Sequence, residues 1–162
     1  MALKLRRVIT GHDNNGHAVV QIDDIAQTND SISGVETSVI WSTDTLPVNN
    51  DGDKDQAKQD MPIIYQGGTV FRIIEFRPGC PVMMHRTSSI DYGLMLKGEA
   101  DMELDDKTLV HLKTGDVFVQ RGTIHAWHNN EKNPAIIAFI LIDAKPVKAG
   151  GKVLEADVHT VK

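Results

Sequence analysis

GCPVMMHRTSSIDYGLMLKG (79–98) and GDVFVQRGTIHAWHN (115–129) are the two stretches that decide the fold and the candidate site of this 162-residue chain. They hold His85, Asp91 and His125 in short runs bounded by glycines. Two imidazoles and one carboxylate are the ligand set of a facial-triad metal site. The same groups also supply an acid–base pair with an orienting partner. The sequence therefore predicts a site of one of these two kinds.

Short strand-like segments dominate the chain. They are rich in branched and apolar residues and are separated by Gly, Asp, Asn or Pro, a pattern typical of strands joined by turns. The run AIIAFILI (135–142) is apolar on both faces, as expected of a central strand between two packed layers. Many short strands at close spacing predict an all-β sandwich or barrel. We expect strands at 19–22, 37–41, 69–76, 92–98, 100–106, 108–113, 116–122 and 135–142.

The spacing of the two stretches resembles the two sequence motifs of the cupin superfamily. The first reads Gly-x5-His-x-Thr-x3-Asp-x6-Gly and the second Gly-x6-Gly-x2-His-x3-Asn. Six anchors at family spacings make this resemblance specific. It implies a cupin-type antiparallel β-barrel (a double-stranded β-helix or jelly roll), with metal ligands at His85, Asp91 and His125. Gly98 and Gly115 are expected to close hairpins with a positive φ.

The chain departs from the family motifs at the expected ligands. Thr87 stands where the first motif has a second histidine, and Asp91 where it has a glutamate. An aspartate is one methylene shorter than a glutamate, so its carboxylate reaches less far toward an ion. The second motif is also one residue shorter between its glycines. A three-ligand site for one divalent metal (Fe, Mn, Ni or Zn) and a metal-free acid–base site both stay open.

In the acid–base interpretation, His125 is the general base or acid, Asp91 orients it, and His85 polarises a substrate carbonyl. Aromatic and sulfur-containing side chains near the motifs would line a pocket for a flat or apolar substrate, with ordinary barrel packing as the alternative for each. Arg86 or Arg121 would pair with a substrate carboxylate. The expected pocket residues are Tyr92, Trp127, Arg121, Thr87, Met84 and Trp41.

Composition narrows the classes of partner. The formal net charge is −5 and no run of Lys and Arg stands out, which argues against nucleic acid. The basic start MALKLRR is followed by no apolar stretch of a secretory signal, and 135–142 is far shorter than the roughly 18 residues of a membrane span. The one cysteine, Cys80, excludes an internal disulfide and is interpreted as a small buried hydrophobe rather than a thiol ligand. We expect a cytoplasmic protein that binds a small molecule.

The length suits one domain. We expect N-terminal strands and a loop (1–60) packed on a cupin barrel core (61–147), followed by a C-terminal tail (148–162). An unpaired N-terminal strand segment would expose an edge that a second copy can cover, so a homodimer is expected.

The resemblance to small stand-alone cupins of secondary-metabolite pathways implies a lyase or isomerase. It would be a dehydratase, decarboxylase or cyclase acting on a small organic acid or a polyketide-like metabolite. A metal-dependent dioxygenase and a non-catalytic small-ligand binder are the alternatives, because a fold does not settle a function.

Overall fold

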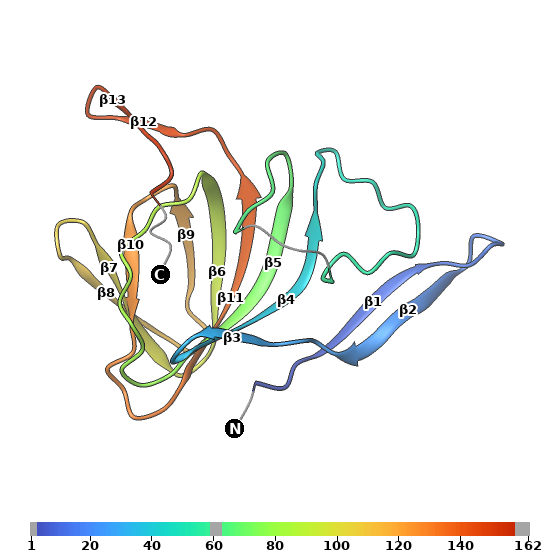
Figure 1. Cartoon of the computed structure of the whole chain (residues 1–162), viewed down its shortest axis with the longest axis horizontal. Coiled ribbons are helices and arrows are strands. Elements are labelled where there is room, and N and C mark those ends of the chain that lie inside the picture. Colours follow the sequence, from blue (N-terminus) through green and yellow to red (C-terminus); the bar gives the residue numbers. More distant parts are fainter. Residues whose placement is uncertain (1–2, 59–62, 158–162) are drawn as a thin grey trace.

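The computed structural model describes residues 3–58 and 63–157, and every regular element in these ranges is a strand, which confirms the predicted all-β fold. No helix there is long and apolar enough to cross a membrane. All the paired strands are antiparallel (Figure 1). The larger sheet has the order β3 (Asn29–Ile32), β4 (Val35–Thr43), β5 (Thr69–Phe76), β11 (Ala135–Asp143), β6 (Ser89–Lys97), β9 (Val117–Arg121). The smaller sheet has the order β10 (His125–His128), β7 (Glu99–Leu104), β8 (Leu109–Lys113). Two-stranded ribbons are formed by β1 (Arg6–His12) with β2 (Ala18–Ile25) and by β12 (Val147–Ala149) with β13 (Lys152–Leu154).

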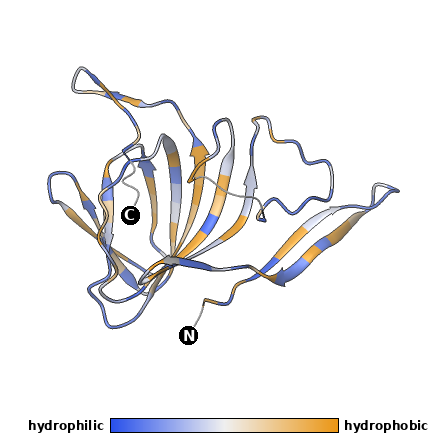
Figure 2. Cartoon of the chain, viewed as in Figure 1, coloured by the Kyte–Doolittle hydropathy of each residue, from blue (hydrophilic) through white to orange (hydrophobic). Residues whose placement is uncertain are grey.

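The larger and the smaller sheet face each other and enclose the main core (Figure 1). Val70, Met95 and Ile137 from the larger sheet pack in one buried cluster with Leu112 and Trp127 from the smaller one. Figure 2 shows hydrophobic and hydrophilic residues alternating along these strands. Because side chains alternate between the faces of a strand, one face of each sheet is left to line the interior.

Strand β11 lies between β5 and β6, so the prediction of a central strand at 135–142 is confirmed. Its inward residues, such as Ile137, belong to the main core. On the outer face Ala138 packs with Ile73 and Leu3 in a second buried cluster. Both faces of β11 are therefore covered, which explains its continuous apolar sequence.

Two glycines stand where the chain passes from one sheet to the other. Gly98 joins β6 to β7 and Gly115 joins β8 to β9, with φ angles of 75° and 94°. A Cβ on Gly98 would lie 2.6 Å from the carbonyl oxygen of Pro134, so any side chain there would displace backbone. The predicted positive φ is confirmed. The predicted hairpins are wrong, because the strands that each glycine joins belong to different sheets and the chain turns a barrel corner instead.

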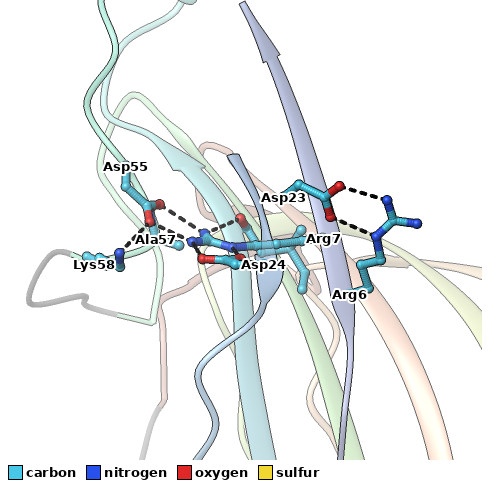
Figure 3. A network of polar contacts seen from close by, with 8 residues as sticks. Arg6, Arg7, Asp23, Asp24, Asp55, Ala57 and Lys58 are labelled. Carbon is cyan, nitrogen blue, oxygen red and sulfur yellow. Dashed lines mark hydrogen bonds and ion pairs between the residues drawn. The ribbon is translucent and has the colours of Figure 1, made fainter. Parts of the chain in front are cut away.

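The β1–β2 ribbon extends away from the barrel (Figure 1) and is held at its base by a buried arginine. Arg7 contacts Asp24 on β2 at 2.7 Å and Asp55, in the loop after β4, at 2.5 Å (Figure 3). The hydrogen bonds from Arg7 lower the pKa of Asp55 to about 2. One guanidinium bonded to two carboxylates thus fixes the ribbon to the body of the protein.

The N-terminal region contributes directly to the barrel, since β4 pairs along its length with β5. The expected boundary at 60 and 61 lies outside the described residues. The C-terminal region begins with the β12–β13 ribbon and returns to the body through a backbone bridge between Asp157 and Arg86. The remainder of the expected tail, 158–162, is outside the described residues.

The outer face of β6 and β9 carries exposed apolar side chains. Val117, Val119 and Tyr92 have 74%, 57% and 45% of their surface accessible. Strand β9 is also an edge of the larger sheet. Contiguous apolar surface of this kind is typical of protein–protein contacts. The homodimer stays a prediction, and this face is where we expect a second copy to bind.

Candidate active site

His85 and His125 form the centre of the site. They face each other in an isolated antiparallel bridge, in which the backbone N–H of each residue donates to the carbonyl oxygen of the other at 2.9 Å. This bridge holds the two imidazole rings 4.3 Å apart between centroids, tilted by 55°. The fold therefore brings together the two histidines that come from separate sequence motifs.

The backbone also orients each ring. The Nδ1 atom of His85 lies 3.0 Å from the carbonyl oxygen of Met83, and that of His125 lies 3.0 Å from the carbonyl oxygen of Thr123. A carbonyl oxygen can only accept, so each Nδ1 atom carries the proton of its neutral ring. The Nε2 atoms then hold their lone pairs and can accept a proton or bind an electrophile.

His125 is the more deeply placed of the two rings, with 3% of its surface exposed. Burial, and next the electrostatic interaction with His85, lower the pKa of His125 to about 4, against the opposing effect of the Thr123 carbonyl. A charge on one ring therefore disfavours a charge on the other. His125 is neutral at physiological pH and presents Nε2 as a proton acceptor.

Asp91 lies at the end of a buried chain of hydroxyl groups. The Thr87 hydroxyl donates to the Ser89 oxygen at 2.7 Å, and the Ser89 hydroxyl donates to Asp91 Oδ1 at 2.5 Å. Burial raises the pKa of the Asp91 carboxyl, while the hydrogen bond from Ser89 and the electrostatic interactions with His85 and Arg72 lower it. Desolvation is the largest of these effects, so the site favours the neutral acid more than water does.

Arg72 and Gln120 also face the barrel interior, and the sequence analysis missed both. Arg72 alternates on β5 with the core residues Val70 and Ile74. Gln120, on β9, pairs directly with Asp91. Each carries a buried polar atom, Arg72 Nε and Gln120 Oε1, with no hydrogen-bond partner among the described residues. The available signal was a charged or amide side chain on the apolar face of a strand.

The predicted metal ligands do not assemble into a site. Within residues 3–58 and 63–157, no group of three or more His, Cys, Asp or Glu side chains is arranged to hold a metal ion. The short Asp91 side chain is held by Ser89, and Thr87 bonds to Ser89 rather than offering a ligand. The three-ligand site at His85, Asp91 and His125 stays a prediction, because the described side chains form no such group in their present positions.

Three of the expected pocket residues lie elsewhere. Neighbouring residues of a strand point to opposite faces, so Tyr92 and Arg121 point outward beside the inward-facing Asp91 and Gln120. Trp41 lines an outer hollow of about 640 Å³ between the β1–β2 ribbon and the loop after β4. That hollow is lined by none of the site residues, so Trp41 does not cap the barrel.

The other expected pocket residues stay close to the histidines. Met84 is half-buried directly before His85, and Thr87 is buried through its bond to Ser89. Trp127 is buried among aromatic rings of the core and meets the ring of His125 edge-on, 6.2 Å between centroids. Its main contribution is core packing, which fixes one side of the His125 ring.

Similar proteins place the chain in a family. It is 34% identical over 163 residues to the cupin-domain-containing oxidoreductase fogC of Aspergillus ruber, covering 96% of this chain and 80% of that protein. It is 39% identical over 158 residues to the phomopsin biosynthesis cluster protein D of Diaporthe leptostromiformis, covering 91% and 83%. No protein-family model matches the chain. At these identities and coverages, the chain belongs to the cupin family.

Solved structures share the fold at low sequence identity. An RmlC-like cupin from Shewanella frigidimarina superposes with a TM-score of 0.50 at 13% identity, covering 74% of this chain and 85% of that one. The polyketide cyclase RemF from Streptomyces resistomycificus superposes with a TM-score of 0.52 at 10% identity, covering 85% and 82%. The predicted cupin-type barrel is confirmed.

Proposed function

We propose that this cupin is an enzyme of secondary metabolism that moves a proton next to the carbonyl group of a small organic acid or polyketide-like metabolite, as a lyase or isomerase. The observation that carries the proposal is the histidine pair, whose Nδ1 atoms are both bound to backbone carbonyls. With Nδ1 bound in this way, the Nε2 lone pair of each ring is left to accept a proton from a substrate.

The surroundings of His125 suit the removal of a proton from the substrate, and those of Asp91 suit the donation of a proton to it. Neutral His125 would take a proton from the carbon next to the carbonyl through Nε2, which leaves an enolate. Asp91, whose pKa burial raises, would give its proton to a leaving hydroxyl group on the adjacent carbon as the C–O bond breaks. The products are water and the unsaturated acid, and a later proton transfer from His125 to Asp91 restores the site.

The similar proteins support the part of the proposal that concerns secondary metabolism. A named biosynthesis cluster protein and a named polyketide cyclase, among the similar proteins, favour a role in secondary metabolism. The Aspergillus ruber relative is an oxidoreductase by name, which favours a second candidate function, oxidation or reduction of a small molecule. His85, His125 and Asp91 are the side chains that would hold a metal ion in that candidate, although the described residues do not group three such ligands. The non-catalytic ligand binder is the third hypothesis.

Proton abstraction can be tested without knowing the full reaction. The full chain is incubated in deuterated water with a panel of small 3-hydroxy acids and their esters, and deuterium at the carbon next to the carbonyl is followed by NMR. Replacing His125 by Gln removes the proton acceptor, and exchange should slow about 10²- to 10⁴-fold. His111→Gln is the matched control, because His111 is exposed and paired with Asp101 on the surface.

Two further readouts separate the candidates. Metal analysis of protein purified without chelator, with oxygen consumption measured on the same panel, tests the oxidoreductase. Exchange that is as fast in His125→Gln as in the wild-type protein would contradict proton transfer by His125. Saturable binding without exchange or oxygen uptake would favour the ligand binder.

A further inference from the structure

Two buried polar atoms inside the barrel lack the contacts that such atoms normally make. Arg72 Nε and Gln120 Oε1 have no hydrogen-bond partner among the described residues. Gln120 is 3% exposed, and its amide N–H donates to the sulfur of Met102 at 3.3 Å. A thioether is a weak acceptor. Most buried polar side-chain atoms in folded proteins have a hydrogen-bond partner. A bound ligand would supply the partners that Arg72 Nε and Gln120 Oε1 lack among the described residues.

The charge of Arg72 also lacks a close counter-ion. Its guanidinium donates to the carbonyl oxygen of Ile63, and no ion pair joins it to an acidic side chain of the described residues. Burial lowers the pKa of Arg72 and only the more distant charge of Asp91 opposes this effect. The Arg72 side chain is half-buried, with its Nε enclosed and without a hydrogen-bond partner among the described residues. A half-buried guanidinium without a close counter-ion favours an anionic ligand.

The strand register places both residues around Asp91. Gln120 is paired with Asp91 across β9 and β6. Arg72 lies on β5, on the other side of β11, where its charge still acts on Asp91. Arg72 is level with Phe139 and Gly93, two residues from Asp91 along β6, so a ligand that contacts both Arg72 and Gln120 must cross β6 near Asp91.

We propose that Arg72 binds the carboxylate of the substrate and that Gln120 Oε1 accepts a hydrogen bond from a hydroxyl group of the same molecule. The substrate class is thus a hydroxy acid, held by its two ends with Asp91 between them. This inference rests on the proposed function and names the class of substrate on which the enzyme would act. Arg121 is set aside because it points into solvent. Arg86 also has an unpartnered Nε among the described residues, but it lies outside the strands that carry Asp91 and Gln120, and its backbone is bridged to Asp157.

Binding of simple probes to the full chain tests this assignment apart from turnover. The probes are 3-hydroxybutyrate, its methyl ester and butyrate, measured by isothermal titration calorimetry. A charge-assisted bidentate contact should make 3-hydroxybutyrate bind about 10- to 100-fold more tightly than the ester. Arg72→Met should remove that difference, and Arg72→Lys should keep part of it. Arg121→Met is the matched control and should change nothing.

Gln120→Leu should abolish the preference for 3-hydroxybutyrate over butyrate and leave butyrate binding unchanged. Urea unfolding supplies the readout that separates binding from a structural role. A cation without a counter-ion contributes no stability, so Arg72→Met should unfold at the same or a higher urea concentration than the wild-type protein.

Equal binding of acid and ester, undiminished acid binding by Arg72→Met, or no saturable binding of any acid would overturn the assignment. Binding should persist in His125→Gln. Loss of the proposed proton transfer therefore leaves this inference standing, and loss of acid binding leaves the proton transfer standing.

Discussion

Burial of His125 should make the protein measurably less stable in mild acid. The ring has a pKa of about 4 in the folded protein, against 6.5 for a free histidine. Between these two values the unfolded chain binds a proton that the folded protein does not. Stability is therefore complete above pH 6.5 and falls as the pH drops toward 4. Integrating the two titrations from pH 7.5 to 4.5 gives a loss of about 2.5 kcal/mol.

Urea unfolding at pH 7.5, 6.0, 5.0 and 4.5, on the wild-type protein and on His125→Gln, isolates this loss. The free-energy difference between the two proteins should shift by about 2.5 kcal/mol in favour of the variant across the range. Contributions from other groups, Asp91 included, cancel to the extent that the variant leaves them unchanged. A difference that stays constant within about 0.5 kcal/mol would refute the assignment of a neutral, desolvated imidazole.

His111 supplies a control of opposite sign. Its hydrogen bond to Asp101 raises its pKa above the ordinary value, so its contribution is present below pH 6.5 and is lost as the pH rises. His111 is exposed, so the effect should be small. His111→Gln should therefore lose stability relative to the wild-type protein in acid, where His125→Gln gains it. The same direction in both variants would show that the assay reports a general acid effect.

Three further predictions concern the scaffold. Arg7→Gln should lower the free energy of unfolding by about 2 kcal/mol, because Asp55 loses its guanidinium partner. The same variant should speed hydrogen exchange in the β1–β2 ribbon. Unchanged exchange would contradict the anchoring role of Arg7. Gly93→Ala should cost about 1–3 kcal/mol in thermal or urea unfolding, since the new Cβ would lie 1.9 Å from the Phe118 ring; a neutral effect would mean that the ring moves freely. Val119→Lys should convert the expected dimer to a monomer in light scattering, because it puts a charge on the exposed outer face; a monomeric wild-type protein would contradict the dimer itself.

The strands and turns could be predicted from the sequence because they depend on local residue patterns. Turn residues and the apolar run at 135–142 predict strands and a central strand, and both are found. The sheet to which each strand belongs depends on contacts far apart in the chain. A positive φ at Gly98 suits a hairpin and a barrel corner equally, so the spacing alone could not separate them.

The site was predicted less completely, and the reason differs from residue to residue. The histidine pair follows from the motif spacing. Tyr92 and Arg121 were placed in the pocket although each is the immediate neighbour of an inward-facing residue, which strand alternation already argues against. Arg72 was overlooked because it lies outside the motifs, in a strand whose other inward residues are apolar.

The metal question shows where sequence reasoning ends. Motif spacing fixes which backbone positions face the interior, and it assigned Asp91 and both histidines to it. It does not fix what the side chains bond to once they are there. Ser89, two residues before Asp91, holds the carboxylate at 2.5 Å and Thr87 holds Ser89, so the two positions that depart from the family motif are bonded into one chain. The two departures from the family motif therefore act together. The Thr87 hydroxyl and the short Asp91 carboxylate complete a hydrogen-bond chain through Ser89. A histidine at 87 and a glutamate at 91 are longer side chains and could not form this chain with the same geometry. The buried carboxyl of Asp91 and the two inward-facing imidazoles are the features on which the proposed proton transfer rests.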